Sequence, residues 1–181
     1  MRLGIADHFG WAVAVTADDG HQVVDRRRVD LVEPGVCTAP IHYESARLDV
    51  VSTAALVAEV RASVVRATAA AFEALSATVP GPIEAIVLRA LPADFPDDIA
   101  VQRQSPYEAR ADAVMYRTVL AAVARERGWD VRAYDAKTVE ARAAEQLGQR
   151  ANEVLRGPRS TLGPPWAKDH RVALAATIVG G

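Results

Sequence analysis

The chain is poor in cysteine and lysine and has no long apolar run. Cys37 is the single cysteine among 181 residues, so the chain can form neither an internal disulfide nor a zinc site built from cysteines. Lys137 and Lys168 are its lysines, and its other basic residues are arginines. No apolar stretch approaches the roughly 20 residues that a membrane-spanning helix needs. We therefore expect a soluble protein that does not enter a membrane.

Several classes of function lack the residues they require. The formal net charge is -2 and the pI is about 6.1, so the strong basic excess of nonspecific nucleic-acid binders is missing and any such role needs a local basic patch. The sequence contains no Gly-x-x-x-x-Gly-Lys loop, no Gly-x-Ser-x-Gly elbow and no His-Glu-x-x-His helix. ATP binding through a phosphate loop, acyl transfer and zinc proteolysis therefore have no support.

The composition and the start of the chain indicate a single cytoplasmic domain. Hydrophobic residues make up 50% of the sequence and charged residues 24%, which at this length predicts one domain, residues 1–181, with a sizeable core. The first apolar run meets Asp7 too soon to contain the hydrophobic region of a secretory signal. We expect the protein to stay in the cytoplasm.

The first thirty or so residues alternate between apolar and polar side chains, which is the period of β-strands. A break at residues 7–10 and an Asp-Gly pair at residues 19–20 divide this region into antiparallel strands, as a tight hairpin turn requires. The predicted strands are residues 2–7, 10–17 and 21–32. Prolines and glycine then end the strand pattern, and residues 33–51 are expected to form a loop.

The period changes to that of helices after residue 52, where Ser52 or Thr53 is expected to cap a helix that ends before Pro80. The nearly all-apolar residues 83–88 predict a strand buried on both faces of a sheet. A long irregular segment, residues 91–104, precedes the next helix. The remaining predicted elements are a helix over 106–127, a strand over 129–134 and helices over 138–147, 150–155 and 169–179.

This order predicts an α/β fold. Antiparallel strands followed by helical crossovers give a five-stranded mixed sheet with helices on both faces.

Two segments, together with this order, resemble the ribonuclease H-like superfamily, and within it the Holliday-junction resolvase branch. In that branch the first strand ends in a catalytic aspartate followed by a turn with glycine, and here Leu3-Gly4-Ile5-Ala6-Asp7-His8-Phe9-Gly10 has the same shape. The last helix of the branch opens with aspartates one turn apart and continues Ala-Leu-Ala, as Asp169-His170-Arg171-Val172-Ala173-Leu174-Ala175 does in part.

The resemblance implies a metal-dependent nuclease or a related phosphoryl-transfer enzyme. Asp7 and Asp169 would be metal ligands for Mg²⁺ or Mn²⁺, His170 would be an auxiliary ligand or base, and nucleic acid would be the substrate. Such chemistry needs several carboxylates, because paired hard ions must hold both the attacking and the leaving oxygen. Arg89 and Val172 stand where the branch has further acids.

Other residues could supply the missing groups. His8 directly follows Asp7, and Glu108 and Asp112 lie four residues apart on one face of a predicted helix. Each acid also has a structural explanation: Asp7 could begin a turn, Asp169 could cap a helix, and Glu108 and Asp112 could be solvated.

Basic and aromatic residues form a further set of candidates. Arginines and a lysine flank the segment before the last helix, where a phosphate could lie near Asp169. This group comprises Arg156, Arg159, Lys168 and Arg171. We expect Arg26-Arg27-Arg28 to form a solvated surface. Trp11, Tyr107 and Trp166 could stack on bases or anchor the core.

Two other functions remain open from the sequence. One is a noncatalytic protein of the same fold that acts as a scaffold or binds a partner, as the missing acids at Arg89 and Val172 indicate. The other is an enzyme that takes a small anionic metabolite beneath residues 91–104, because one fold can host unrelated functions. The exposed outer strand and apolar helices are compatible with a homodimer.

Overall fold

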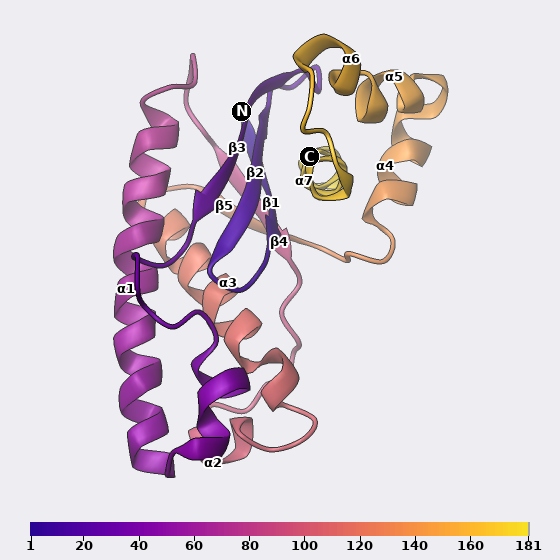
Figure 1. Ribbon diagram of the computed structural model, residues 1–181. Helices are drawn as coiled ribbons and strands as arrows, with labels where there is room; N and C mark the ends of the chain where they lie inside the picture. The colour runs from indigo at the N-terminus through magenta and orange to yellow at the C-terminus, as the bar shows by residue number, and fades with distance from the viewer. Residues whose placement is uncertain (181) are drawn as a thin grey trace.

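The computed structural model describes residues 1–180 and contains a five-stranded mixed sheet between two groups of helices (Figure 1). Its strands lie in the order β3-β2-β1-β4-β5. Their bounds are β1 Arg2–Asp7, β2 Trp11–Ala17, β3 Val23–Asp30, β4 Ala85–Arg89 and β5 Asp130–Tyr134. The predicted α/β fold class and the predicted strands are confirmed, with bounds that differ by one or two residues.

Strand β1 lies at the centre of the sheet. It pairs antiparallel with β2, which pairs antiparallel with β3, and it pairs parallel with β4, which pairs parallel with β5. The carboxyl ends of β1, β4 and β5 therefore lie at the same edge of the sheet. This edge holds Asp7, Arg89 and Tyr134, the last residues of the three parallel strands.

Helices cover both faces of the sheet (Figure 1). On one face lie the long helices α1, Val50–Ser76, and α3, Glu108–Glu126, which pack against each other. The other face carries α7, with α4 behind it. The remaining bounds are η1 Pro40–Glu44, η2 Ser45–Arg47, α2 Ile99–Gln102, α4 Val139–Leu147, η3 Gly148–Arg150, α5 Ala151–Arg156, α6 Pro158–Leu162 and α7 Lys168–Val179.

Alternation along β1 divides the core into two parts. Leu3 and Ile5 pack with α1 and α3, whereas Ala6 packs with α7. Because successive side chains of a strand point to opposite faces, Asp7 shares the α3 side with Ile5. The partner of the Asp7 carboxylate is therefore expected on the α3 side of the sheet rather than on α7.

Two local expectations were wrong. Helix α1 begins earlier than predicted, because Asp49 rather than Ser52 or Thr53 is its N-cap and accepts a hydrogen bond from the Ser52 backbone at 2.6 Å. An aspartate is as good a cap as a serine, so the pattern alone does not choose between them. The expected loop, residues 33–51, also contains the short helical turns η1 and η2.

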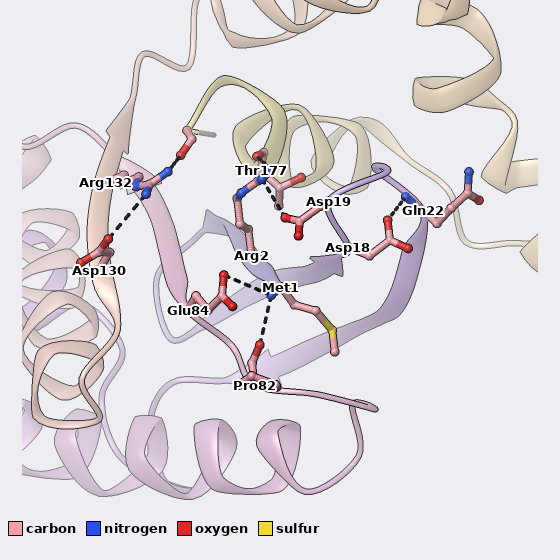
Figure 2. A network of polar contacts seen from close by, with 11 residues as sticks. Met1, Arg2, Asp18, Asp19, Gln22, Pro82, Glu84, Asp130, Arg132 and Thr177 are labelled. Carbon is pink, nitrogen blue, oxygen red and sulfur yellow. Dashed lines mark hydrogen bonds and ion pairs between the residues drawn. The ribbon is translucent and has the colours of Figure 1, made fainter.

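Polar contacts tie together the opposite end of the sheet (Figure 2). The amino group of Met1 donates to the Pro82 carbonyl at 3.0 Å, and the Arg2 side chain reaches Asp19 at 2.9 Å.

Within residues 1–180 no helix is long and apolar enough to cross a membrane.

Gly4 allows α7 to pack closely against β1. A Cβ atom added at this position would lie 1.9 Å from the carbonyl oxygen of Ala173 in α7. A backbone atom cannot move aside as a flexible side chain can. The absence of a side chain at Gly4 therefore sets how closely the last helix approaches the central strand.

Changing Gly4 to alanine is expected to lower the free energy of unfolding by about 3 kcal/mol, because the helix must shift away from the sheet. Guanidinium denaturation followed by circular dichroism measures this loss. Gly20→Ala is the matched control, since its new Cβ would meet nothing closer than Asp18 at 3.4 Å. Equal losses in the two variants would contradict the close packing of α7.

Candidate functional site

A buried ion pair occupies the end of the central strand. Asp7 ends β1, and Nε of Arg117 on α3 donates to its Oδ2 at 2.8 Å. The side chains are only 3% and 10% exposed, respectively. A charge this far from water is costly unless it is paired. Arg117 thus neutralises the carboxylate that the sequence identifies as the first candidate ligand.

This ion pair forms part of the wall of a cavity of about 440 Å³ at the carboxyl edge of the sheet. Two more arginines line it: Arg89 at the end of β4 and the exposed Arg110 in the first turns of α3. Phe9 and Pro92 contribute apolar walls. We call this the Asp7 cavity. With three guanidinium groups and one carboxylate, its charge favours an anion.

Two polar atoms of these residues are buried without a hydrogen-bond partner. They are Oδ1 of Asp7, an acceptor, and Nε of Arg89, a donor. Buried polar atoms are nearly always satisfied in folded proteins, so exceptions call for an explanation. Both residues line the Asp7 cavity, but these two atoms lie beneath its surface, so a ligand there reaches them only after the side chains turn toward it.

Tyr134 closes the site from β5. Its hydroxyl donates to the carbonyl of Ile5 at 2.8 Å. Burial raises the pKa of Tyr134 to about 12, and the nearby Asp7 charge acts in the same direction. The residue therefore stays protonated at neutral pH and serves as a fixed donor within the sheet edge.

His8 connects the end of β1 to the start of α7. Its Nε2 lies 3.0 Å from Oδ2 of Asp169, and its ring stacks on Trp11 at 4.1 Å. The guanidinium carbon of Arg28 lies 4.3 Å from the centroid of the same indole. Trp11 is thus already in contact with both His8 and Arg28.

His170 has a structural contact beside this cluster. Its Nδ1 accepts a hydrogen bond from the Ala167 backbone at 3.3 Å at the start of α7. Burial lowers the pKa of His170, and the charge of Arg26 lowers it further. The imidazole is therefore neutral at pH 7. Trp166 is also buried and donates its indole N–H to the carbonyl of Leu155.

The remaining candidate acids contact other parts of the chain. Asp112 accepts hydrogen bonds from the backbone of Ile41 and His42 at 3.1 and 2.9 Å, so it holds η1 against α3. Burial raises the pKa of Asp112. Glu108 opens α3, and its Oε2 is buried without a partner. Neither acid lines the Asp7 cavity.

The side chains around Asp7 do not fit a pair of divalent ions. Such ions require several oxygen ligands, but one Asp7 oxygen is bound to Arg117 and the cavity's other charged side chains are arginines. Between Met1 and Gly180, no group of three or more histidine, cysteine, aspartate or glutamate side chains could hold a metal. Asp7 and Asp169 as metal ligands stay a prediction.

The basic residues differ from expectation in where they gather. Arg26 binds backbone carbonyls of residues 162–165 and so anchors the segment before α7, whereas Arg171 pairs with Glu140. The arginines near the strand ends, Arg89, Arg110 and Arg117, were not predicted as a cluster. In the sequence Arg89 stands out because it takes the place of a family acid, whereas Arg110 and Arg117 resemble ordinary solvated residues of a helix.

Comparison with solved structures identifies the architecture. No family model and no curated protein matches the sequence. The structure of T. thermophilus RuvC in complex with Holliday junction substrate matches 98% of this chain and 89% of its own, with a TM-score of 0.51 and 12% identity. The fold is the ribonuclease H-like fold of RuvC. A second Thermus thermophilus RuvC structure aligns over 98% and 90%, with 14% identity and a TM-score of 0.46.

The likeness to RuvC confirms the predicted ribonuclease H-like fold with its five-stranded mixed sheet. At this identity it concerns the fold alone. What the site can do therefore rests on its own residues.

Neutralising Asp7 should destabilise the protein even in metal-free buffer. Asp7→Asn removes the charge that balances buried Arg117, and we expect unfolding to become easier by about 3 kcal/mol. Asp19→Asn is the control, because its pair with Arg2 is exposed and contributes below about 1 kcal/mol. Urea denaturation in EDTA compares the two. Unchanged or higher stability in Asp7→Asn would instead show that the pair with Arg117 does not stabilise the folded state.

Proposed function

We propose that this ribonuclease H-like domain binds nucleic acid by its phosphate groups in the Asp7 cavity, without a metal pair. The observation that supports this proposal is the ion pair of Arg117 with Asp7 in a cavity that Arg89 and Arg110 also line. The carboxylate offsets one guanidinium, so the cavity keeps a net positive charge. Arginine is well suited to phosphate, because its planar donors match two phosphate oxygens at once.

The two buried polar atoms without a hydrogen-bond partner, Nε of Arg89 and Oδ1 of Asp7, are of the types that a nucleotide can bind. Nε of Arg89 is a buried donor without a partner, and a phosphate oxygen would accept from it once the side chain turns toward the cavity. Oδ1 of Asp7 is a buried acceptor, and a sugar hydroxyl or base amino group would donate to it. Phe9 and Pro92 provide apolar surface for the sugar or base. A nucleotide unit contains all three kinds of group.

The similarity in fold gives nucleic acid preference over other anions. The RuvC structure holds a Holliday junction substrate, and this chain presents its arginines at the carboxyl edge of the same kind of sheet. A small anionic metabolite shares the phosphate or carboxylate chemistry, and it becomes an outcome of the binding experiment.

Metal-dependent cleavage is the second candidate, with Asp7 and Asp169 as ligands of Mg²⁺ or Mn²⁺ and His170 as an auxiliary group. The contact between His8 and Asp169 favours it, because it brings the start of α7 to the end of β1. The free Oδ1 of Asp7 is also a suitable oxygen for a hard cation. In this case Arg117 would have to leave Asp7.

Arg110→Ala is expected to weaken binding of single-stranded DNA at least fivefold, because one charged phosphate contact is lost. Arg110 is exposed and has little part in the fold. Fluorescence anisotropy with a labelled 12-nucleotide strand in low salt and EDTA measures the dissociation constant. Arg61→Ala, an exposed position on α1, controls for the lost charge. Competition by inorganic phosphate or a mononucleotide as strong as by the strand would indicate a small metabolite instead.

Magnesium or manganese is not expected to raise the melting temperature, since a ligand stabilises only if it binds the native state. Differential scanning fluorimetry of the native protein and Asp7→Asn tests this. A metal-induced rise that disappears in Asp7→Asn would overturn the proposal and favour the metal-dependent nuclease, and cleavage of branched DNA and RNA would then be measured.

A further inference from the structure

A second, smaller cavity of about 190 Å³ adjoins the Asp7 cavity. Arg89 and Arg117 line both cavities, so they form the wall between them. On its far side the second cavity is bordered by Arg125, in the last turn of α3. We call it the Arg125 cavity. Any ligand group in it is close to the same two arginines that serve the Asp7 cavity.

Arg125 is the additional cation of this cavity. The side chain is exposed on α3. Arg132 also borders the cavity, but its guanidinium contacts the carbonyl of Gly180 and the carboxylate of Asp130 (Figure 2). Arg132 is thus engaged in holding the end of α7, whereas Arg125 extends the positive surface of the site.

The arginines of α3 are spaced too widely for one phosphate. Arg110, Arg117 and Arg125 are separated by seven and eight residues, which at 1.5 Å per residue is about 10 and 12 Å along the helix axis. One phosphate group cannot contact both outer arginines. A ligand that uses the whole row must carry more than one anionic group.

The floor of the Arg125 cavity is apolar. It is formed by the buried Leu88 and Ala121 and the partly buried Val131. At its rim lies Leu91, which is 45% exposed although it is a large apolar side chain. Apolar surface beside a cation fits a nucleotide, whose base or sugar can pack against the floor while its phosphate meets the arginine.

Resting on the proposed function, we infer that the Arg125 cavity is the subsite for a neighbouring nucleotide of a single strand that lies along α3. Its base packs on the floor at Leu88 and Ala121, and its phosphate contacts Arg125. The first phosphate is held in the Asp7 cavity. The site thus takes a chain of nucleotides rather than one phosphate monoester.

A single strand fits this arrangement better than a duplex. The side chain of Arg117 is about nine-tenths buried in the wall between the cavities, so a phosphate must enter the cavity to contact it. A flexible single strand can bend into the cavities and turn a base toward the floor. The bases of a duplex are stacked inside and cannot do so without unpairing.

The test compares Arg125→Ala, Arg110→Ala and the control Arg61→Ala in binding a mononucleotide and a 12-nucleotide single strand. Arg125→Ala should weaken binding of the strand at least fivefold and leave binding of the mononucleotide within twofold. The slope of the logarithm of the strand-binding constant against the logarithm of the salt concentration should decrease by the amount expected for roughly one lost phosphate contact. Leu91→Glu, a change at an exposed rim position, should weaken strand binding in the same way by repulsion.

The outcomes separate the two proposals. If Arg110→Ala weakens strand binding but Arg125→Ala and Leu91→Glu do not, the second subsite is wrong and the proposed function stands. If none of these variants differs from Arg61→Ala, or if the native protein does not bind the strand, both are wrong. A duplex of the same length that binds as tightly as the strand would overturn the single-strand assignment.

Discussion

The ion pair between Asp7 and Arg117 determines the electrostatics of the whole site. Removing two charges from water costs several kcal/mol per ion, and a well-packed apolar pair is often at least as stable. A pair that is 3% and 10% exposed is therefore weak evidence for a purely stabilising role. Its effect on the cavity is clearer. Because Arg117 cancels the Asp7 charge, Arg89 and Arg110 set the sign of the potential, and that sign attracts anions.

In the proposed function, the carboxyl edge of this ribonuclease H-like sheet binds phosphate without metal ions. Metal-assisted cleavage brings phosphate to the strand ends through cations held by acids. Here the cations are guanidinium groups that belong to the chain, with Arg89 at the end of β4 and Arg117 opposite β1. Under this proposal the guanidinium groups bind the phosphate directly. A guanidinium positions a phosphate well, but unlike a metal ion it does not lower the pKa of a bound water to generate a nucleophile, which is why binding is the better supported function.

The sequence predicted the sheet well because alternating and all-apolar runs have few explanations other than strands. Asp7 was predicted as a site residue on a different ground, the resemblance to the resolvase branch, whose first strand ends in an aspartate. The sequence did not predict Arg117, because an arginine in an amphipathic helix looks the same whether it faces solvent or a buried carboxylate 110 residues away. The sequence offered Asp112 as a candidate acid or a solvated residue, but did not predict its contact with η1, because its partners there are backbone N–H groups, which carry no sequence signal.

The alternation of β1 explains why the two acids of the resolvase-like segments have separate partners. Asp7 shares the α3 side of the strand with Ile5, whereas α7 packs on the side of Ala6. His8 directly follows Asp7, so its side chain points to the opposite side of the strand, the side of α7. There it contacts Asp169 at the start of that helix. Each acid has its own basic partner. Joining them in one metal site would require both partners to move, and Arg89 would still place a positive charge beside the metal.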